Sequence, residues 1–450
     1  MDDQQDSVTK LLEAFRAAES GTVPQGGIWR TLKTAKAAVG TGLSMVSGRF
    51  RGRGDGGLSN ADLKAIEKLV GNLGELKGMA MKMGQIISYV DDSLPAEMRQ
   101  LMALLQTQSQ PTAFPLVEKT LTEDLGPRAG QILAGMDRTP CSVASIGQVH
   151  RSTLPDGRQV AVKVLHPGML EALESDFQMA KLGPMFARAM VPGGAASVAE
   201  FMDEARTRLM EECNYSVEAQ RQREFGQLYR HSETVTIPEV HDEWCGQRVL
   251  VTSWEPGLSF EQFLASQPSQ ETRDKVGAAL FDFYFGTLYR NGLFHADPHP
   301  GNYALREGGR LVIYDFGCTR RFDQQTVLAL SNLGHAVAQD KEDAIRKAFA
   351  ELGGQIPRDW DSYERVRAML RSFFSPMLSK GRCPVDASVN VAMGQVMKDK
   401  MLLMRLKIPG KLLFLFRIRF GLYAVLARLG AQCDWSSMEQ QFYAQHTNSN

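Results

Sequence analysis

The stretch from Leu293 to Arg320 constrains this chain more than any other, because it sets three potential oxygen ligands around one short strand. Asp297 stands five positions before Asn302, and Asp315 directly follows the apolar run at 311–314. A carboxylate at the end of a buried strand is costly unless a cation or a hydrogen-bond donor pairs with it. Carboxylate and amide oxygens are also the ligands that Mg²⁺ takes beside phosphate oxygens. The spacing therefore predicts a nucleotide site with bound Mg²⁺, in which Asn302 and Asp315 hold the metal and Asp297 accepts a proton.

Taken one at a time, these residues have simpler explanations. His295, His299 and Asp297 are residue types that cap backbone groups in turns, and Pro298 favours a turn at this point. Their order along the chain, ahead of the Asp-Phe-Gly sequence at 315–317, is what favours the nucleotide site.

Composition limits the other choices. The 450 residues are 43% hydrophobic, which is enough for a core in one large domain or in two to three smaller ones. Basic and acidic residues number 51 each, so no overall field recruits nucleic acid, and we expect no nucleic-acid partner. The six cysteines lack zinc spacing, which predicts reduced thiols in a cytoplasmic setting. The N-terminus is polar, and the apolar segment at 411–429 carries three arginines, so we expect a buried helix there and no membrane span.

Four regions are expected along the chain. Residues 1–60 are rich in glycine, serine and arginine and predict a poorly ordered arm. Its basic amphipathic segment at 28–45 suits either a peripheral membrane contact or packing on its own domain. Residues 61–138 follow a helical pattern that includes a helix at 114–125, and residues 139–255 predict a small strand-rich part with inserted helices. Residues 256–450 predict a mainly helical part, with a helix at 270–291 that leads into the predicted site.

A second group of candidate residues lies in the strand-rich part. The sequence predicts a hairpin with its turn at Pro155–Gly157, and the second strand carries Lys163 among apolar neighbours. A lysine in a buried strand is rare unless a carboxylate or a phosphate pairs with it. In protein kinases the lysine of such a V-A-x-K strand holds the α- and β-phosphates, and a helix glutamate orients it. The segment at 211–218 supplies candidate glutamates, among them Glu218.

Two further strands are predicted at 235–240 and 247–252, which would complete a five-stranded sheet. A turn after them leads into the helical part. We expect an adenine base to lie against the backbone of this turn, with Thr252 and Trp254 as its contacts.

Two departures from an ordinary protein kinase are visible. No G-x-G-x-x-G sequence precedes Lys163. The loop expected to cover the phosphates consists instead of Val143, Ala144, Ser145, Ile146 and Gly147. Side chains with a Cβ restrict φ and stiffen such a loop, which predicts a different nucleotide pose or slower transfer. No A-P-E sequence follows residue 317 either, so the surface that binds a peptide substrate is expected to be missing.

Six motifs occur in a fixed order: KMGQ at 82–85, ASIGQVH at 144–150, VAVK at 160–163, ECNYSVEAQ at 212–220, HADPHPGN at 295–302 and DFG at 315–317. In this order they resemble the ABC1/UbiB/AarF/Coq8 (ADCK) family of atypical protein-kinase-like proteins, over roughly residues 63–429. The resemblance implies an α+β, protein-kinase-like bilobal fold with a small β-rich lobe, a helical lobe and a family-specific N-terminal helical extension.

The resemblance also implies roles for single residues. Lys163 would pair with Glu218, Asp297 would be the base-like aspartate, and Asn302 and Asp315 would hold Mg²⁺.

A family regulatory motif is implied as well. Lys82 and Gln85 would belong to helices that cover the place where a peptide would otherwise bind. The family's E-x-D motif is represented here by Glu212 and Asn214, so one carboxylate that would face Lys82 is lost. The family's run of alanines is replaced by Ser142-Val143-Ala144. Regulation and nucleotide preference are therefore the features that transfer least directly from the family.

As a function, the resemblance implies ATP and Mg²⁺ binding with ATPase or small-molecule phosphotransfer activity that supports isoprenoid-quinone (ubiquinone) biosynthesis or lipid homeostasis. The implied partners are lipid or quinone-precursor small molecules and quinone-biosynthesis proteins, with a peripheral location at the inner membrane face. Two alternatives stay open. One is a catalytically weak pseudokinase that acts as a nucleotide- or lipid-regulated binding module, and Val143 and Asn214 favour this alternative. The other is an antibiotic- or choline-type phosphotransferase, which shares H-x-D-x-x-x-x-N but does not account for KMGQ or ASIGQVH.

Overall fold

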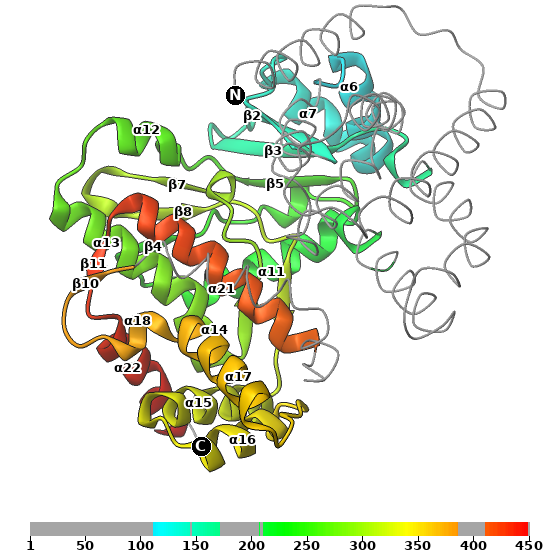
Figure 1. Ribbon diagram of the computed structural model, residues 1–450. Coiled ribbons are helices and arrows are strands. Elements are labelled where there is room, and N and C mark those ends of the chain that lie inside the picture. The colour runs from blue at the N-terminus through cyan, green and yellow to red at the C-terminus, as the bar shows by residue number, and fades with distance from the viewer. Residues whose placement is uncertain (1–110, 145, 172–206, 208–209, 386–409, 449–450) are drawn as a thin grey trace, which may run out of the picture. The chain divides into compact units, whose positions relative to one another are not determined.

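The computed structural model describes residues 111–144, 146–171, 207, 210–385 and 410–448 (Figure 1). The predicted arm, the helical extension as far as residue 110, and with them Lys82 and Gln85, lie outside these residues, as does Ser145. The chain divides into two compact units, and the elements below belong to the unit formed mainly by residues 111–167 and 208–450.

A four-stranded antiparallel sheet forms the small lobe. Its strands follow the order β1 (Ser142–Val143), β2 (Gly147–Thr153), β3 (Gln159–Leu165) and β5 (Val249–Ser253). Figure 1 shows β2, β3 and β5 side by side. The turn between β2 and β3 contains Gly157 with a φ of 88°, a backbone angle that glycine adopts easily. The hairpin predicted around Pro155–Gly157 is confirmed.

Alternation along these strands gives the sheet two different faces. One face is buried against two helices, α6 (Phe114–Leu125) and α7 (Ala129–Ala134), and the sequence prediction of a helix at 114–125 is confirmed. The valines of this face are Val160, Val162, Val164, Val249 and Val251. The opposite face carries Lys163, which lies opposite Val149 on β2 and Leu250 on β5.

The expectation of a five-stranded sheet is wrong in one respect. The fourth strand, β4 (Val235–Thr236), is short and pairs in parallel with β8 (Leu311–Ile313), in a separate sheet that β7 (Tyr303–Leu305) completes. Pro238 has no N–H to donate, so a longer strand at this point would lack one hydrogen bond of its ladder. The strand-rich segment therefore contributes to two sheets.

The helix expected at 270–291 is confirmed, with a local change of pitch. α13 (Gln270–Phe281) continues through a π-helical turn at Asp282–Gly286 into α14 (Thr287–Asn291). Gly292 ends the helix in the left-handed conformation, with a φ of 64°. The chain then enters β6 (Leu293–His295), which pairs with β9 (Thr319–Arg321). Such π-helical turns often lie beside functional sites, and this one precedes the predicted catalytic loop.

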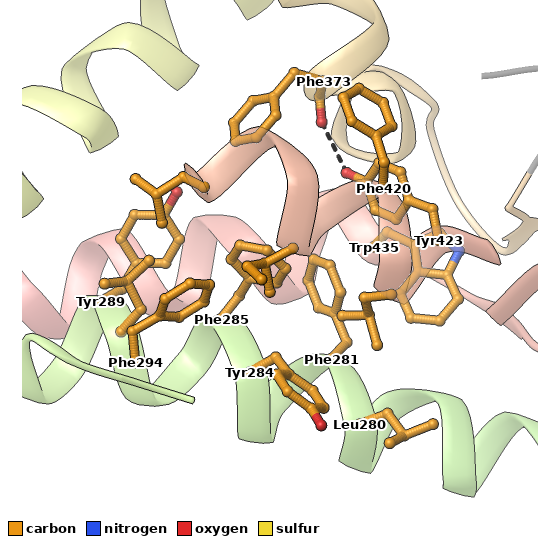
Figure 2. Packing of buried hydrophobic residues seen from close by; sticks show 14 of the residues in the cluster. Leu280, Phe281, Tyr284, Phe285, Tyr289, Phe294, Phe373, Phe420, Tyr423 and Trp435 are labelled. Carbon is orange, nitrogen blue, oxygen red and sulfur yellow. Dashed lines mark hydrogen bonds between the residues drawn. The ribbon is translucent and has the colours of Figure 1, made fainter. Parts of the chain in front are cut away.

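The other α-helices of the described residues are α11 (Tyr215–Leu228), α12 (Phe260–Ala265), α15 (Gln324–Gln339), α16 (Glu342–Glu351), α17 (Trp360–Phe373), α18 (Ser375–Leu378), α21 (Gly410–Leu429) and α22 (Trp435–Asn448). A two-stranded ribbon is formed by β10 (Cys383–Pro384) and β11 (Gln432–Cys433). Figure 2 shows the aromatic core of the helical lobe, in which Phe281 packs against Phe285 and Trp435. In the same core the Tyr423 hydroxyl donates to the Phe373 carbonyl oxygen at 2.9 Å.

The buried helix predicted at 411–429 is confirmed as α21. Its Arg419 is fully buried and pairs with Glu439 on α22. The rings of Phe285 and Phe373 lie 4.6 and 4.7 Å from the guanidinium group, which adds cation–π attraction to the ion pair. Among the described residues, no helix combines the length and apolar character needed to cross a membrane.

Candidate nucleotide site

Three charged side chains from distant parts of the sequence meet in one cluster. Lys163 Nζ lies 2.7 and 2.9 Å from the two carboxylate oxygens of Glu218 on α11, and 3.3 Å from Asp315 Oδ2. The exposed fraction of the side chain is 15% for Lys163 and 5% for Glu218, but 38% for Asp315. The Asp315 carboxylate is therefore the part of the cluster that solvent or a ligand reaches. The expected pairing of Lys163 with Glu218 is present, while the roles of these residues toward a nucleotide stay predictions.

The surroundings keep Lys163 charged. Burial alone would lower the pKa of its ammonium group, but the carboxylates of Asp315 and Glu218 outweigh this effect and raise that pKa well above its usual value. Burial raises the pKa of Glu218, and the neighbouring Lys163 opposes this shift. At neutral pH the ammonium group is thus charged, held by Glu218 of α11, and next to the partly exposed carboxylate of Asp315.

The Asp-Phe-Gly segment is also held by α11. Phe316 is fully buried, and its N–H lies 3.4 Å from Glu218 Oε1. Arg221 donates to the Gly317 carbonyl oxygen at 2.8 Å. Glu218 and Arg221 stand three positions apart and so lie on the same face of the helix. The helix therefore fixes the backbone just after Asp315 at two points.

A buried histidine joins the two parts of the predicted site. His295 Nε2 lies 2.6 Å from the Asp315 carbonyl oxygen, and the Asp297 N–H donates to His295 Nδ1 at 3.4 Å. A carbonyl oxygen can only accept, so the proton is on Nε2 and the ring is neutral. Burial lowers the pKa of His295, which agrees with a neutral ring. The imidazole therefore sets the position of the Asp297 backbone relative to that of Asp315.

Asp297 and Asn302 are held together within one loop. The Asp297 carbonyl oxygen accepts hydrogen bonds from the Tyr284 hydroxyl at 3.0 Å and from Asn302 Nδ2 at 3.3 Å. Tyr284 belongs to the π-helical turn, which is how that turn supports the loop. The Asn302 carbonyl oxygen accepts a hydrogen bond at 2.9 Å from the backbone N–H of Tyr314, the residue just before Asp315. The Asp297 side chain is half-buried, and its Oδ1 accepts a hydrogen bond from the His299 backbone N–H at 3.3 Å. Asp297 therefore also makes the turn contact that is typical of aspartate.

The oxygen donors suit a magnesium ion that arrives with phosphate. Within the part of the chain that the structure describes, no three histidine, cysteine or acidic side chains are grouped to hold a metal ion by themselves. Asp315 and Asn302 instead offer one carboxylate and one amide. Mg²⁺ commonly takes one or two protein ligands and completes its shell with phosphate oxygens and waters. The residues present therefore fit nucleotide-bound Mg²⁺.

The loop expected to cover the phosphates is a tight turn between β1 and β2. The Ala144 N–H donates to the Gly147 carbonyl oxygen at 2.8 Å. Val143 and Ala144 are half-buried, and Ile146 is buried. A Cβ on Gly147 would overlap the Tyr215 hydroxyl at the start of α11. Glycine is needed here because the Val164 carbonyl oxygen also lies only 2.6 Å from the position that a Cβ would take.

Thr252 and Trp254 have different surroundings at the end of β5. Thr252 is buried opposite Ala161, on the face of the sheet that carries the lysine. The guanidinium group of Arg151 lies 5.3 Å from the centre of the Trp254 ring. The Trp254 N–H donates to the Gln159 carbonyl oxygen at 3.0 Å. This backbone donor is already used by β3, so a base bound at the turn would need other contacts there.

Four residues beside the site were missed by the sequence reasoning. Val149 and Ala161 lie on the same sheet face as Lys163, and counting alternate positions of the hairpin would find them. Arg221 and Tyr284 carry no signal of this kind. In the sequence Arg221 is indistinguishable from a solvated helix charge, and the π-helical turn around Tyr284 shifts the expected helix face.

The second half of the ASIGQVH motif has a structural role. Gln148 and His150 are buried on the sheet face that packs against α6 and α7. Gln148 Oε1 accepts the Thr112 N–H at 2.7 Å, and His150 Nδ1 donates to the Asp137 carbonyl oxygen at 2.7 Å. These contacts attach the segments before and after the two helices to the sheet. The motif thus combines the loop that is expected to cover the phosphates with an anchor for α6 and α7.

Asn214 caps the N-terminus of α11. Its Oδ1 accepts the Ser216 N–H at 3.1 Å. Asparagine and aspartate are similarly good N-cap residues, so this contact tolerates asparagine in place of the family's aspartate. Glu212 is half-buried two positions earlier. The expected contact of this motif with Lys82 lies outside the described residues.

Together, the fold and the cluster define a class of protein. An antiparallel sheet bears a lysine paired with a helix glutamate, and a mainly helical part supplies an Asp-Phe-Gly segment to the same cluster. This is an α+β, protein-kinase-like fold. The chain belongs to the ABC1 family, because the family model described as "ABC1 atypical kinase-like domain" matches residues 104–349.

Similar proteins come from several organisms. The chain is 28% identical over 312 residues to "Protein ACTIVITY OF BC1 COMPLEX KINASE 8, chloroplastic" of Arabidopsis thaliana. The aligned region covers 67% of this chain but only 40% of the plant protein. It is 25% identical over 350 residues to "Atypical kinase COQ8, mitochondrial" of Saccharomyces cerevisiae, covering 74% of this chain and 68% of the yeast protein. A solved complex of Rv3197 with erythromycin from Mycobacterium tuberculosis is 28% identical with a TM-score of 0.63, over 84% of this chain and 95% of that one.

Proposed function

We propose that this protein binds ATP and Mg²⁺ at the Lys163 cluster and catalyses ATP hydrolysis or phosphotransfer to a small molecule, in support of isoprenoid-quinone (ubiquinone) biosynthesis or lipid homeostasis. The observation that carries the proposal is the contact of Lys163 with both Glu218 and the partly exposed Asp315. A fixed ammonium group attracts phosphate, and an exposed carboxylate beside it attracts the accompanying cation. The link to quinone metabolism comes from the family. Contacts with quinone-precursor lipids, with quinone-biosynthesis proteins and with a membrane surface are part of the same proposal.

In this proposal the residues of the chain position the reactants. Lys163 holds phosphate oxygens, while Asn302 and Asp315 hold Mg²⁺. The metal supplies positive charge that stabilises the transferred phosphoryl group. Asp297 accepts the proton of the attacking water or hydroxyl group.

The acceptor is expected to be water or a small molecule. After the Asp-Phe-Gly segment the chain forms β9, which ends at Arg321, and α15 begins at Gln324. This stretch leaves no extended segment between the two elements on which a peptide substrate could lie.

Single-turnover ATP hydrolysis by the full chain tests the proposal. Asp315→Asn should reduce Mg²⁺-dependent hydrolysis by roughly a hundredfold or more, because it removes a charged metal ligand. The matched control is Asp361→Asn on α17, whose side chain is 77% exposed, and it should leave hydrolysis unchanged. If the wild type shows no Mg²⁺-dependent nucleotide affinity, or if Asp315→Asn has no effect, the proposal is wrong. Accumulation of quinone precursors in a deletion strain tests the metabolic part separately.

A catalytically weak binding module is the second candidate. Val143 in the phosphate loop and Asn214 in the regulatory motif favour it, and the solved relative is a complex with erythromycin. In this case ATP would bind without turnover and would change the affinity for a lipid or a partner protein. Nucleotide binding with no hydrolysis in the single-turnover assay would support the module over the enzyme.

A further inference from the structure

Two of the six cysteines lie directly opposite each other in the ribbon of β10 and β11. The two strands pair antiparallel, with Cys383 opposite Cys433. Directly opposite residues of such a pair have their side chains on the same face, with Cα atoms about 4.5–5.5 Å apart. Disulfide bonds join residues whose Cα atoms are about 4.4–6.8 Å apart. Neither Cys383 nor Cys433 takes part in a disulfide bond in the structure, so this pair is placed for a bond that is not formed.

Contacts on both strands hold the two cysteines in this register. Cys433 is buried in the main core, and Cys383 is half-buried and packs against the same core. The Cys433 thiol donates to the Asp274 carbonyl oxygen at 3.4 Å. The Asp274 carboxylate accepts the Gln432 N–H at 2.7 Å and pairs with Arg382. One acidic side chain of α13 thus binds a neighbour of each cysteine, which leaves the strands little freedom to slip.

We propose that Cys383 and Cys433 are a modification site, at which a hydroperoxide oxidises the two thiols to an intramolecular disulfide bond. The Cys383 sulfur, which is the more accessible, attacks the hydroperoxide. The O–O bond breaks, and Cys383 becomes a sulfenic acid while water or an alcohol leaves. The Cys433 sulfur then attacks the sulfenic sulfur, the S–S bond forms, and the hydroxyl group leaves as water with the remaining thiol proton. The two electrons lost by the thiols are those that reduce the O–O bond.

The order of the two steps follows from the surroundings of each thiol. Burial raises the pKa of Cys433 to about 11, so this thiol is a poor first nucleophile at neutral pH. It needs only to meet the sulfenic acid that forms opposite it. The half-buried Cys383 is therefore the peroxide-reactive residue and Cys433 the resolving residue.

The bond would close a loop that contains the whole of α21. This helix passes close to the predicted catalytic loop, because a Cβ on Gly421 would lie 3.1 Å from Pro298 Cγ. Closing a loop of this length reduces the entropy of the unfolded chain and so stabilises the fold. The first measurable consequence is a higher unfolding temperature of the oxidised protein.

The full chain is treated with hydrogen peroxide, its free thiols are blocked with iodoacetamide, and it is digested with trypsin without reduction. We expect a cross-link between the tryptic peptides 383–398 and 429–450, which dithiothreitol removes. Cys383→Ser and Cys433→Ser should each abolish it, while the control Cys141→Ser, which removes an exposed thiol elsewhere, should keep it. Oxidation should raise the unfolding temperature of the wild type by roughly 5–10 °C, and that of the two serine variants should not rise.

Two results would overturn the inference. One is that peptides 383–398 and 429–450 are both recovered with alkylated cysteines at a peroxide concentration that oxidises the exposed Cys141. The other is a mixture in which Cys433 is cross-linked to other cysteines as often as to Cys383. The cross-link is measured on the wild type, so the test does not depend on the folding of a variant. It also requires no nucleotide, so its outcome is independent of the proposed function.

Discussion

Replacing Glu218 with glutamine removes the charge that holds Lys163 while keeping the size of the side chain. Both Glu218 oxygens lie within 2.9 Å of Lys163 Nζ, and both side chains are largely shielded from solvent. Removing one partner of a buried ion pair costs about 3–5 kcal/mol. Asp315 remains as a second partner at 3.3 Å, and the glutamine oxygen can still accept a hydrogen bond. We therefore expect Glu218→Gln to lower the free energy of unfolding by about 2–3 kcal/mol.

Urea-induced unfolding, followed by circular dichroism, measures this loss. The matched control is Glu224→Gln on the same helix, because Glu224 pairs with Arg321 at the surface, with 41% and 61% of the side chains exposed. Exposed ion pairs contribute about 0–1 kcal/mol. Glu218→Gln should lower the unfolding midpoint with an unchanged slope, while Glu224→Gln should leave the midpoint nearly unchanged. Equal losses from the two substitutions would refute the reasoning, which attributes the effect to burial of the Lys163 pair.

Two further predictions concern the neighbours of the cluster. Arg221→Lys keeps the charge but loses the planar group that binds the Gly317 carbonyl oxygen, so the Mg²⁺ concentration for half-maximal nucleotide binding in calorimetric titrations should rise by roughly tenfold. An unchanged Mg²⁺ requirement would mean that the contact of Arg221 with Gly317 does not position Asp315. Acidification should destabilise the fold from about pH 6.5 to pH 5, because burial lowers the pKa of both His150 and His295 and the unfolded chain then binds protons that the native chain does not. Unfolding measured across this range should lose up to about 1.4 kcal/mol per pH unit for each histidine. His150→Gln should reduce the slope, whereas the control His231→Gln, at an exposed position, should leave it nearly unchanged. A slope unaffected by His150→Gln would contradict the assignment.

Much of the fold was predictable because its signals are local. The helix at 114–125 follows from apolar spacing along one segment. The hairpin follows from a turn sequence between two alternating strands, and its Gly157 adopts the positive φ that such turns use. The strand at 235–240 was overestimated because β-branched residues favour a strand locally, whereas Pro238 and the available partner decide its length and its sheet.

The amino-acid sequence already shows which residues are chemically unusual and in which order they occur: a lysine within an apolar strand, an aspartate five positions before an asparagine, and an aspartate at a strand end. Which of these groups meet depends on the folded chain. In the structure Lys163 pairs with Glu218 and with no other glutamate of the described segment at 211–218, and Arg221 donates to the Gly317 carbonyl oxygen. The backbone N–H of Trp254 donates to β3 within the sheet. The physical reason is that hydrogen bonds and ion pairs depend on distances of about 3 Å between groups far apart in the chain. Periodicity along one segment contains no information about such distances.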